Sequence, residues 1–320
     1  MTQGSRDNRK LLRRASWLSF WVGVTMLAIK SAAWWMTRSA AILSDAAESV
    51  VHLAAVAFVV YSLRLSQKPP DEDHPYGHAK ISFFSAGLEG SLILIAGIGI
   101  LAQAIYQWIN GIVPHDMGWG SLLIAAAVVI NGWLGWYLKR IGRKHQSLIL
   151  ESNGQHVLVD AWTSLGVLVG VILVWLTGWM WLDPLCAIFV ALHILRGGFQ
   201  LTWRSAEGLM DRADPKTQKL LVTCLDESVK DLEITWHQMR HRHLGDRHWV
   251  DFHLVFDDDT TVRDAHAMAT DVESAVREML GGDTVVTTHL EPKEDHVRIH
   301  GYAPGHEPPL ADDRRDLSPD

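Results

Sequence analysis

The first two thirds of the chain consists mainly of long apolar runs. Six of them can be counted, at about residues 17–36, 40–63, 81–109, 117–138, 148–175 and 182–203. Each is long enough to cross a bilayer as a helix, since about 20 apolar residues are needed. The pattern predicts an α-helical membrane protein with six transmembrane helices between residues 17 and 210.

The chain changes character after about residue 210 and becomes polar and charged. Amphipathic helices are predicted at residues 215–229 and 261–280, the first opened by Asp214 as N-cap and Pro215 at the first helical position. Alternating strands are predicted at residues 236–243, 248–256 and 284–290. This order predicts an α+β (αββαβ) domain over residues 211–298, with its helices on one face of a three-stranded sheet.

The charges outside the runs predict the orientation. Residues 1–16 are basic, and the basic segments 139–144 and 204–212 fall on the same side of a six-helix bundle. By the positive-inside tendency we expect a multi-pass protein of the cell (inner) membrane with cytoplasmic N- and C-termini. No cleavable signal peptide is expected, and residues 299–320 are expected to be a disordered tail.

The composition limits which metal ligands and which partners the chain can use. The only two cysteines, Cys186 and Cys224, fall in different domains and suggest no disulfide framework, so metal sites would use histidine and carboxylate. A net charge of −7 is wrong for a globally basic nucleic-acid binder, and no nucleic-acid partner is expected.

Two of the apolar runs carry ionisable residues in pairs at the same spacing. The second run carries Asp45, Glu48 and His52, although a charge near the bilayer centre costs a few kcal/mol or more and usually marks an ion pathway or binding site. Glu48 and His52 are four residues apart and share a helix face. The fifth run carries His156 and Asp160 at the same spacing.

The two pairs are expected at the same depth. Glu48 and His52 lie roughly 13–20 Å from the outer surface, and His156 and Asp160 roughly 12–18 Å from the inner one. In a core about 30 Å thick these levels overlap. Two histidines and two carboxylates can form a tetrahedron that suits Zn²⁺. The alternative is a set of separate helix-packing contacts with protonated carboxylates.

Other polar residues in the runs receive different interpretations. Asp45 lies one turn from Glu48 on the same face, where it could admit the metal or support a ligand. Lys30, Glu89 and Asn131 are expected to be structural, as snorkelling or paired charges and an interhelical hydrogen bond.

From about Trp17 to Pro292 the sequence resembles the cation diffusion facilitator family. Six helices, paired ligands on the second and fifth, and a cytoplasmic αββαβ domain are that family's layout. His156 and Asp160 match its HxxxD pattern. Glu48 and His52 stand where the family usually has DxxxD or HxxxD, so the resemblance implies a zinc-like site but leaves metal selectivity open.

The resemblance also implies a second metal site in the loop between the second and third helices. Asp71, His74 and His78 match its ligands, and the two imidazoles share one side if the loop begins the third helix. A polar interfacial loop is the alternative. Lys80 and Asp211 match a family ion pair that ties the third helix to the start of the soluble domain.

A third site is implied in the cytoplasmic domain. Five positions match a binuclear metal site near the dimer interface of the family: His237, His253, His266, His289 and Glu291. The glutamate stands where the family often has aspartate. Metal bound there is expected to bridge two subunits and tighten the dimer.

The same part of the chain carries three more histidines, His241, His243 and His248. These three histidines could add a metal site. For them, and for the histidines of the third site, the alternative is that they are surface residues that bind no metal.

The function predicted from these residues is a homodimeric antiporter, not an enzyme. It exchanges a divalent metal cation, zinc in the first instance, for protons and exports the metal from the cytoplasm; Zn²⁺ is substrate and regulatory ligand, and no cofactor is expected. Transport of Fe²⁺, Co²⁺, Cd²⁺ or Mn²⁺ is one alternative. A membrane-anchored metal sensor or assembly protein is another, although it should have lost the membrane ligands. An intramembrane metallohydrolase would need an open metal position, and there is no HExxH motif.

Overall fold

The computed structural model describes residues 3–37, 40–110, 119–244, 247–281 and 284–294, in two compact units that divide between Met210 and Asp211. The first unit contains α1 (Gln3–Thr37), α2 (Ala40–Ser66), α3 (Ile81–Asn110), α4 (Trp119–Lys144), α5 (Leu148–Thr177) and α6 (Leu182–Leu209). The second contains α7 (Pro215–Val229), β1 (Thr235–His243), β2 (His248–Phe256), α8 (Val262–Leu280) and β3 (Val285–Pro292). The tail at residues 299–320 lies outside the described residues.

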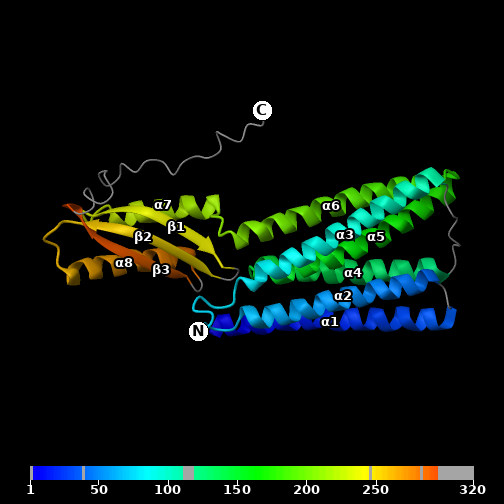
Figure 1. The fold of residues 1–320 in the computed structure, drawn as a ribbon, viewed down its shortest axis with the longest axis horizontal. Helices are drawn as coiled ribbons and strands as arrows, with labels where there is room; N and C mark the ends of the chain where they lie inside the picture. Colours follow the sequence, from blue (N-terminus) through cyan, green and yellow to red (C-terminus); the bar gives the residue numbers. More distant parts are fainter. Residues whose placement is uncertain (1–2, 38–39, 111–118, 245–246, 282–283, 295–320) are drawn as a thin grey trace, which may run out of the picture. The chain divides into compact units, whose positions relative to one another are not determined.

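The six helices of the first unit run lengthwise beside one another (Figure 1). Helices are expected here because the hydrocarbon offers no water to backbone N–H and C=O groups, which a helix satisfies internally. Within the described residues, α3, α6 and residues 148–174 of α5 are long and apolar enough to cross a membrane. Helix α1 begins at Gln3, well before the predicted span, because its basic first turns contain arginine, lysine and leucine, which are good helix formers.

Helix α5 is the central helix of the bundle. It packs against α4, α3, α6 and α2. Ile149, Leu150 and Val157 belong to a buried cluster with residues of α1, α2 and α4, whereas Leu148 and Val159 belong to a second cluster with α3 and α6. The bundle therefore consists of two packing groups that share α5.

The second unit is the predicted α+β fold. The sheet order is β1-β2-β3, with β1 antiparallel and β3 parallel to β2. Asp214 caps α7 by accepting a hydrogen bond from the Thr217 amide, and Pro215 is the first helical residue, as predicted. Leu221 of α7 and Val272 of α8 pack with Phe252 in one core, so both helices cover the same face of the sheet.

Strand β1 contains a β-bulge. His237 is opposite His253, but Arg240 is opposite Asp251, so two residues of β1 stand opposite Phe252. Gln238, inside the bulge, has φ of 49°. The extra residue shifts the alternation of side chains along β1 by one position, because the side-chain period of a strand is two.

Candidate metal centres

The first candidate centre lies inside the helix bundle. His52 from α2 meets His156 and Asp160 from α5: the two imidazole rings are 4.8 Å apart, and His52 Nδ1 is 3.6 Å from Asp160 Oδ2. One ligand atom from each side chain lies within 4.8 Å of the others, which is the spacing of groups around one metal ion. The spacing HxxxD on α5 thus delivers both side chains to α2, as the sequence pattern predicts.

The other two predicted groups on α2 are Asp45 and Glu48. Both belong to the helix, but their side chains lie outside the described residues. The assignment of Glu48 as fourth ligand stays a prediction.

Helix α3 supplies a residue that the sequence did not single out for the site. Glu89 Oε2 lies 2.7 Å from His156 Nδ1, and the glutamate side chain is only 3% exposed. We expected Glu89 to be a paired structural charge; it is paired, but with a candidate ligand. Because α3 and α5 are far apart in the sequence and meet only by helix packing, this contact has no signal in local spacing.

The second candidate centre is the loop before α3. Asp71 Oδ1 lies 3.0 Å from His74 Nδ1, and Asp71 Oδ2 lies 3.4 Å from His78 Nε2. The predicted ligands are therefore brought together, but not by a helical turn. Helix α3 begins only at Ile81, after Gly77, whose φ of 82° lies in the left-handed region that a right-handed helix cannot use.

A lysine competes for the loop carboxylate. The Lys68 ammonium forms an ion pair with Asp71 Oδ2, and this contact, followed by hydrogen bonds from His74, holds the pKa of Asp71 far below its usual range. The carboxylate is therefore ionised and ready to bind a cation. A metal ion at this loop would have to share or displace Lys68.

The third candidate centre lies on the sheet of the second unit. Glu291 on β3 bridges two histidines: its Oε2 is 2.9 Å from His237 Nε2 and its Oε1 is 2.7 Å from His253 Nδ1. His289 stands at the margin, with its Nε2 3.6 Å from Glu291 Oε1 and its side chain 65% exposed. Antiparallel pairing of His237 with His253 and parallel pairing of His253 with His289 place the three imidazoles side by side.

The fifth predicted ligand of this centre is not part of the cluster. His266 is exposed on α8, and α8 covers the opposite face of the sheet from His253. Within one chain the sheet separates the two imidazoles, so His266 could join such a centre only from a second subunit.

The β-bulge separates the remaining histidines from the third centre. His241 is opposite Val250, and His243 is opposite His248, all on the helix-covered face. Without the bulge, His237 and His241 would share a face because they are four residues apart in a strand. These three histidines therefore lie on the other face of the sheet from His237 and His253, although they are close to them in sequence.

Burial lowers the pKa of two histidines on the helix-covered face, His241 and His248. Desolvation lowers the pKa of His241 below its ordinary value of 6.5, and the neighbouring His248 lowers it further, whereas Asp214 opposes the shift. The pKa of His248 is lowered in the same way by burial. Both imidazoles are consequently held neutral near pH 7.

Comparison with known proteins agrees with the division into a helical membrane domain and a cytoplasmic domain. Residues 16–210 match the family model described as "Cation efflux transmembrane domain", and residues 228–293 match "Cation efflux protein, cytoplasmic domain". The chain belongs to the cation diffusion facilitator family. It is thus an integral membrane transporter for cations, with a cytoplasmic domain of the type that dimerises in this family, and it is not an enzyme.

Individual relatives of this facilitator span nearly its whole length. The uncharacterized transporter sll1263 of Synechocystis sp. is 35% identical over 89% of this chain and 92% of its own. The cation-efflux pumps FieF of Salmonella arizonae and of Citrobacter koseri are each 26% identical over 88% of this chain and 93% of theirs.

The ion pair predicted between Lys80 and Asp211 would join the two units of the facilitator, and it stays a prediction. Within the second unit, Asp211 Oδ2 accepts a hydrogen bond from Arg242 Nη1 at 3.2 Å.

Proposed function

We propose that this facilitator exports zinc from the cytoplasm in exchange for protons. The observation that carries the proposal is the meeting of His52, His156 and Asp160 inside the helix bundle. Nitrogen and carboxylate ligands suit Zn²⁺, and Glu48, the residue one turn from His52, would complete an N2O2 set. Fe²⁺, Co²⁺, Cd²⁺ and Mn²⁺ use similar ligands and are the competing substrates.

Proton coupling follows from the chemistry of the ligands. A metal ion binds neutral imidazole and ionised carboxylate, so its arrival from the cytoplasm displaces protons from the site. On the outer side protons compete for the same atoms and the metal leaves. The inward proton gradient then drives the cycle, with both termini of the protein cytoplasmic.

The two packing groups of the bundle suggest how access alternates. Movement of α3 and α6 against α1, α2 and α4 would open one side of the site and close the other, as in transporters that rock around a central site. The contact between Glu89 and His156 joins α3 to α5, the helix that both groups share. It therefore couples the orientation of a candidate ligand to the position of the α3–α6 group.

The cytoplasmic cluster supports regulation in a homodimer. Glu291 already holds His237 and His253 together, and His266 of a second subunit would supply the ligand that one chain cannot. Metal bound between subunits would tighten the dimer, since a ligand favours the state that it binds better. The loop residues Asp71, His74 and His78 form a further candidate site of lower affinity, because Lys68 competes for the carboxylate.

Proteoliposomes with an internal pH indicator test the proposal. Addition of Zn²⁺ should change the internal pH, and Asp160→Ala should abolish the signal without loss of the folded dimer. Asp73→Ala removes an exposed carboxylate outside the three clusters and is the control. The same assay with Fe²⁺, Co²⁺, Cd²⁺ and Mn²⁺ in place of Zn²⁺ identifies which cation is transported. Transport at the parent rate by Asp160→Ala would exclude the assignment, and zinc flux without a pH change would exclude proton exchange.

A further inference from the structure

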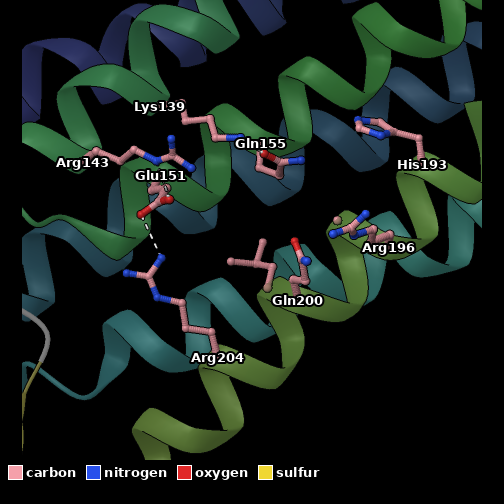
Figure 2. Close-up of a pocket in the computed structure, with 10 residues that line it drawn as sticks. Lys139, Arg143, Glu151, Gln155, His193, Arg196, Gln200 and Arg204 are labelled. Atoms are coloured by element: carbon pink, nitrogen blue, oxygen red, sulfur yellow. Dashed lines mark hydrogen bonds and ion pairs between the residues drawn. The ribbon is translucent and has the colours of Figure 1, made fainter. Parts of the chain in front are cut away.

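A basic pocket opens among α4, α5 and α6, and none of its lining residues belongs to the three candidate metal centres. Its volume is about 440 Å³, and ten residues line it (Figure 2). Lys139 and Arg143 come from α4, and Arg196 and Arg204 come from α6. Glu151 of α5 is the one carboxylate among the lining residues, which leaves an excess of three positive charges with His193 neutral.

Each oxygen of the Glu151 carboxylate accepts a hydrogen bond from an arginine of the pocket. Glu151 Oε1 accepts from Arg143 Nε at 3.0 Å, and Glu151 Oε2 accepts from Arg204 Nη1 at 3.1 Å. Lys139 donates to the neutral amide oxygen of Gln155. Figure 2 shows the Lys139 side chain directed toward Gln155, with Arg196 on α6 at the other side of Gln155. Among the described residues, the direct ion pairs of Glu151 are with Arg143 and Arg204, and its carboxylate acts on Lys139 only at longer range.

The excess positive charge of the pocket argues against cation passage and favours anion binding. Like charges repel, so a cavity with three excess positive charges is no path for a divalent cation. It is suited to an anion. Guanidinium groups bind phosphate through paired hydrogen bonds, and Lys139 adds a point charge.

The position of the pocket matches the level of lipid headgroups. Lys139 is five residues from the end of α4, and Glu151 is three residues from the start of α5, or roughly 5–8 Å from the helix ends. Arg196 lies deeper, within the predicted sixth span, where an arginine needs an anionic partner or access to water. Phe199 and Trp203 of α6 are exposed and stacked, and they offer apolar surface for acyl chains.

We propose that this pocket binds a phosphate group, and that the headgroup of an anionic lipid supplies it. Basic pockets between transmembrane helices near a membrane surface are typical sites for such headgroups. Because the pocket lies where α4, α5 and α6 meet, a bound headgroup would hold the α4–α5 pair to α6 at this end of the bundle.

Binding to the full-length protein in detergent tests the proposal, with three probes: dioctanoyl phosphatidylglycerol, dioctanoyl phosphatidylcholine and inorganic phosphate. Native mass spectrometry or thermophoresis gives the affinities. We expect phosphatidylglycerol to bind at least about tenfold more tightly than phosphatidylcholine, as hydrogen bonds between charged groups allow. Arg196→Gln combined with Lys139→Gln should remove this preference.

Two variants keep the test interpretable. Arg140→Gln removes a neighbouring cation that lies over the Trp136 ring and outside the pocket, and it should bind the lipid as the parent does. Arg196→Lys keeps the charge but loses the planar fork, and it should bind with intermediate affinity. If the double variant does not fold, this single variant still decides.

Three results would overturn the proposal. Equal affinity for the two lipids would show that the pocket does not recognise a headgroup with net negative charge. Equal binding by the parent and by the pocket variants would place the lipid elsewhere. Saturation by inorganic phosphate with the same dependence on Arg196 and Lys139, and no lipid preference, would assign the pocket to free phosphate instead of a headgroup.

Discussion

The contact between Glu89 and His156 offers a direct test of the membrane site. Glu89 Oε2 lies 2.7 Å from His156 Nδ1 inside the bundle. A metal-bound imidazole almost always gives its second ring nitrogen to an acceptor, so we expect Glu89 to hold Nδ1 and leave Nε2 for the metal. Glu89→Gln keeps the size of the side chain and removes its charge.

The size of the effect follows from this geometry. Loss of such a supporting carboxylate lowers metal affinity about 10–100-fold. This corresponds to about 1.4–2.8 kcal/mol of binding free energy. Because the glutamate is 3% exposed, solvent screens the contact little, and the upper half of this range is expected.

Zinc flux into proteoliposomes, measured over a range of zinc concentrations, gives the half-saturating concentration. A competition assay with a fluorescent chelator gives the affinity directly. Glu207→Gln changes a carboxylate on α6 that contacts Trp203, and it is the matched control. If Glu89→Gln binds zinc as tightly as the parent and only Asp160→Ala loses affinity, then Glu89 does not act through His156.

Three further outcomes are expected. The folded chain should lose stability as the pH falls below about 6.5, because buried His241 resists the proton that the unfolded chain accepts; His241→Asn should flatten the dependence of melting temperature on pH, whereas exposed His266→Asn should not. Gly154→Val should destabilise the detergent-solubilised protein by about 1–3 kcal/mol or more, since a Cβ there would meet the Lys139 amide nitrogen at 2.5 Å, and Gly99→Val, in open space, should not. Glu291→Ala should abolish any zinc-dependent strengthening of the dimer in sedimentation experiments; strengthening equal to that of the parent would refute the bridging role.

The sequence predicted the elements that depend on local patterns. Asp214 and Pro215 marked the start of α7, and the HxxxD spacing placed His156 and Asp160 on one face of α5. These features follow from helix geometry and capping, which are properties of neighbouring residues.

Features that depend on the packing of separate elements could not be predicted from the sequence. Glu89 meets His156 only because α3 lies against α5. The α3 sequence indicates that a glutamate within an apolar run needs a partner, but not which residue that partner is. The basic pocket draws its residues from three helices. The bulge in β1 contains Gln238 and Met239, with neither glycine nor proline to indicate an irregular strand.

That bulge has a consequence for how relatives are compared. A one-residue insertion or deletion at Gln238 would exchange the two faces of the strand beyond it, so that His241 and Arg240 would trade places between the helix-covered core and the open face. The number of histidines in β1 is therefore a poor guide to the chemistry of the sheet. When related sequences are aligned, the position of a single gap decides which histidines are equivalent.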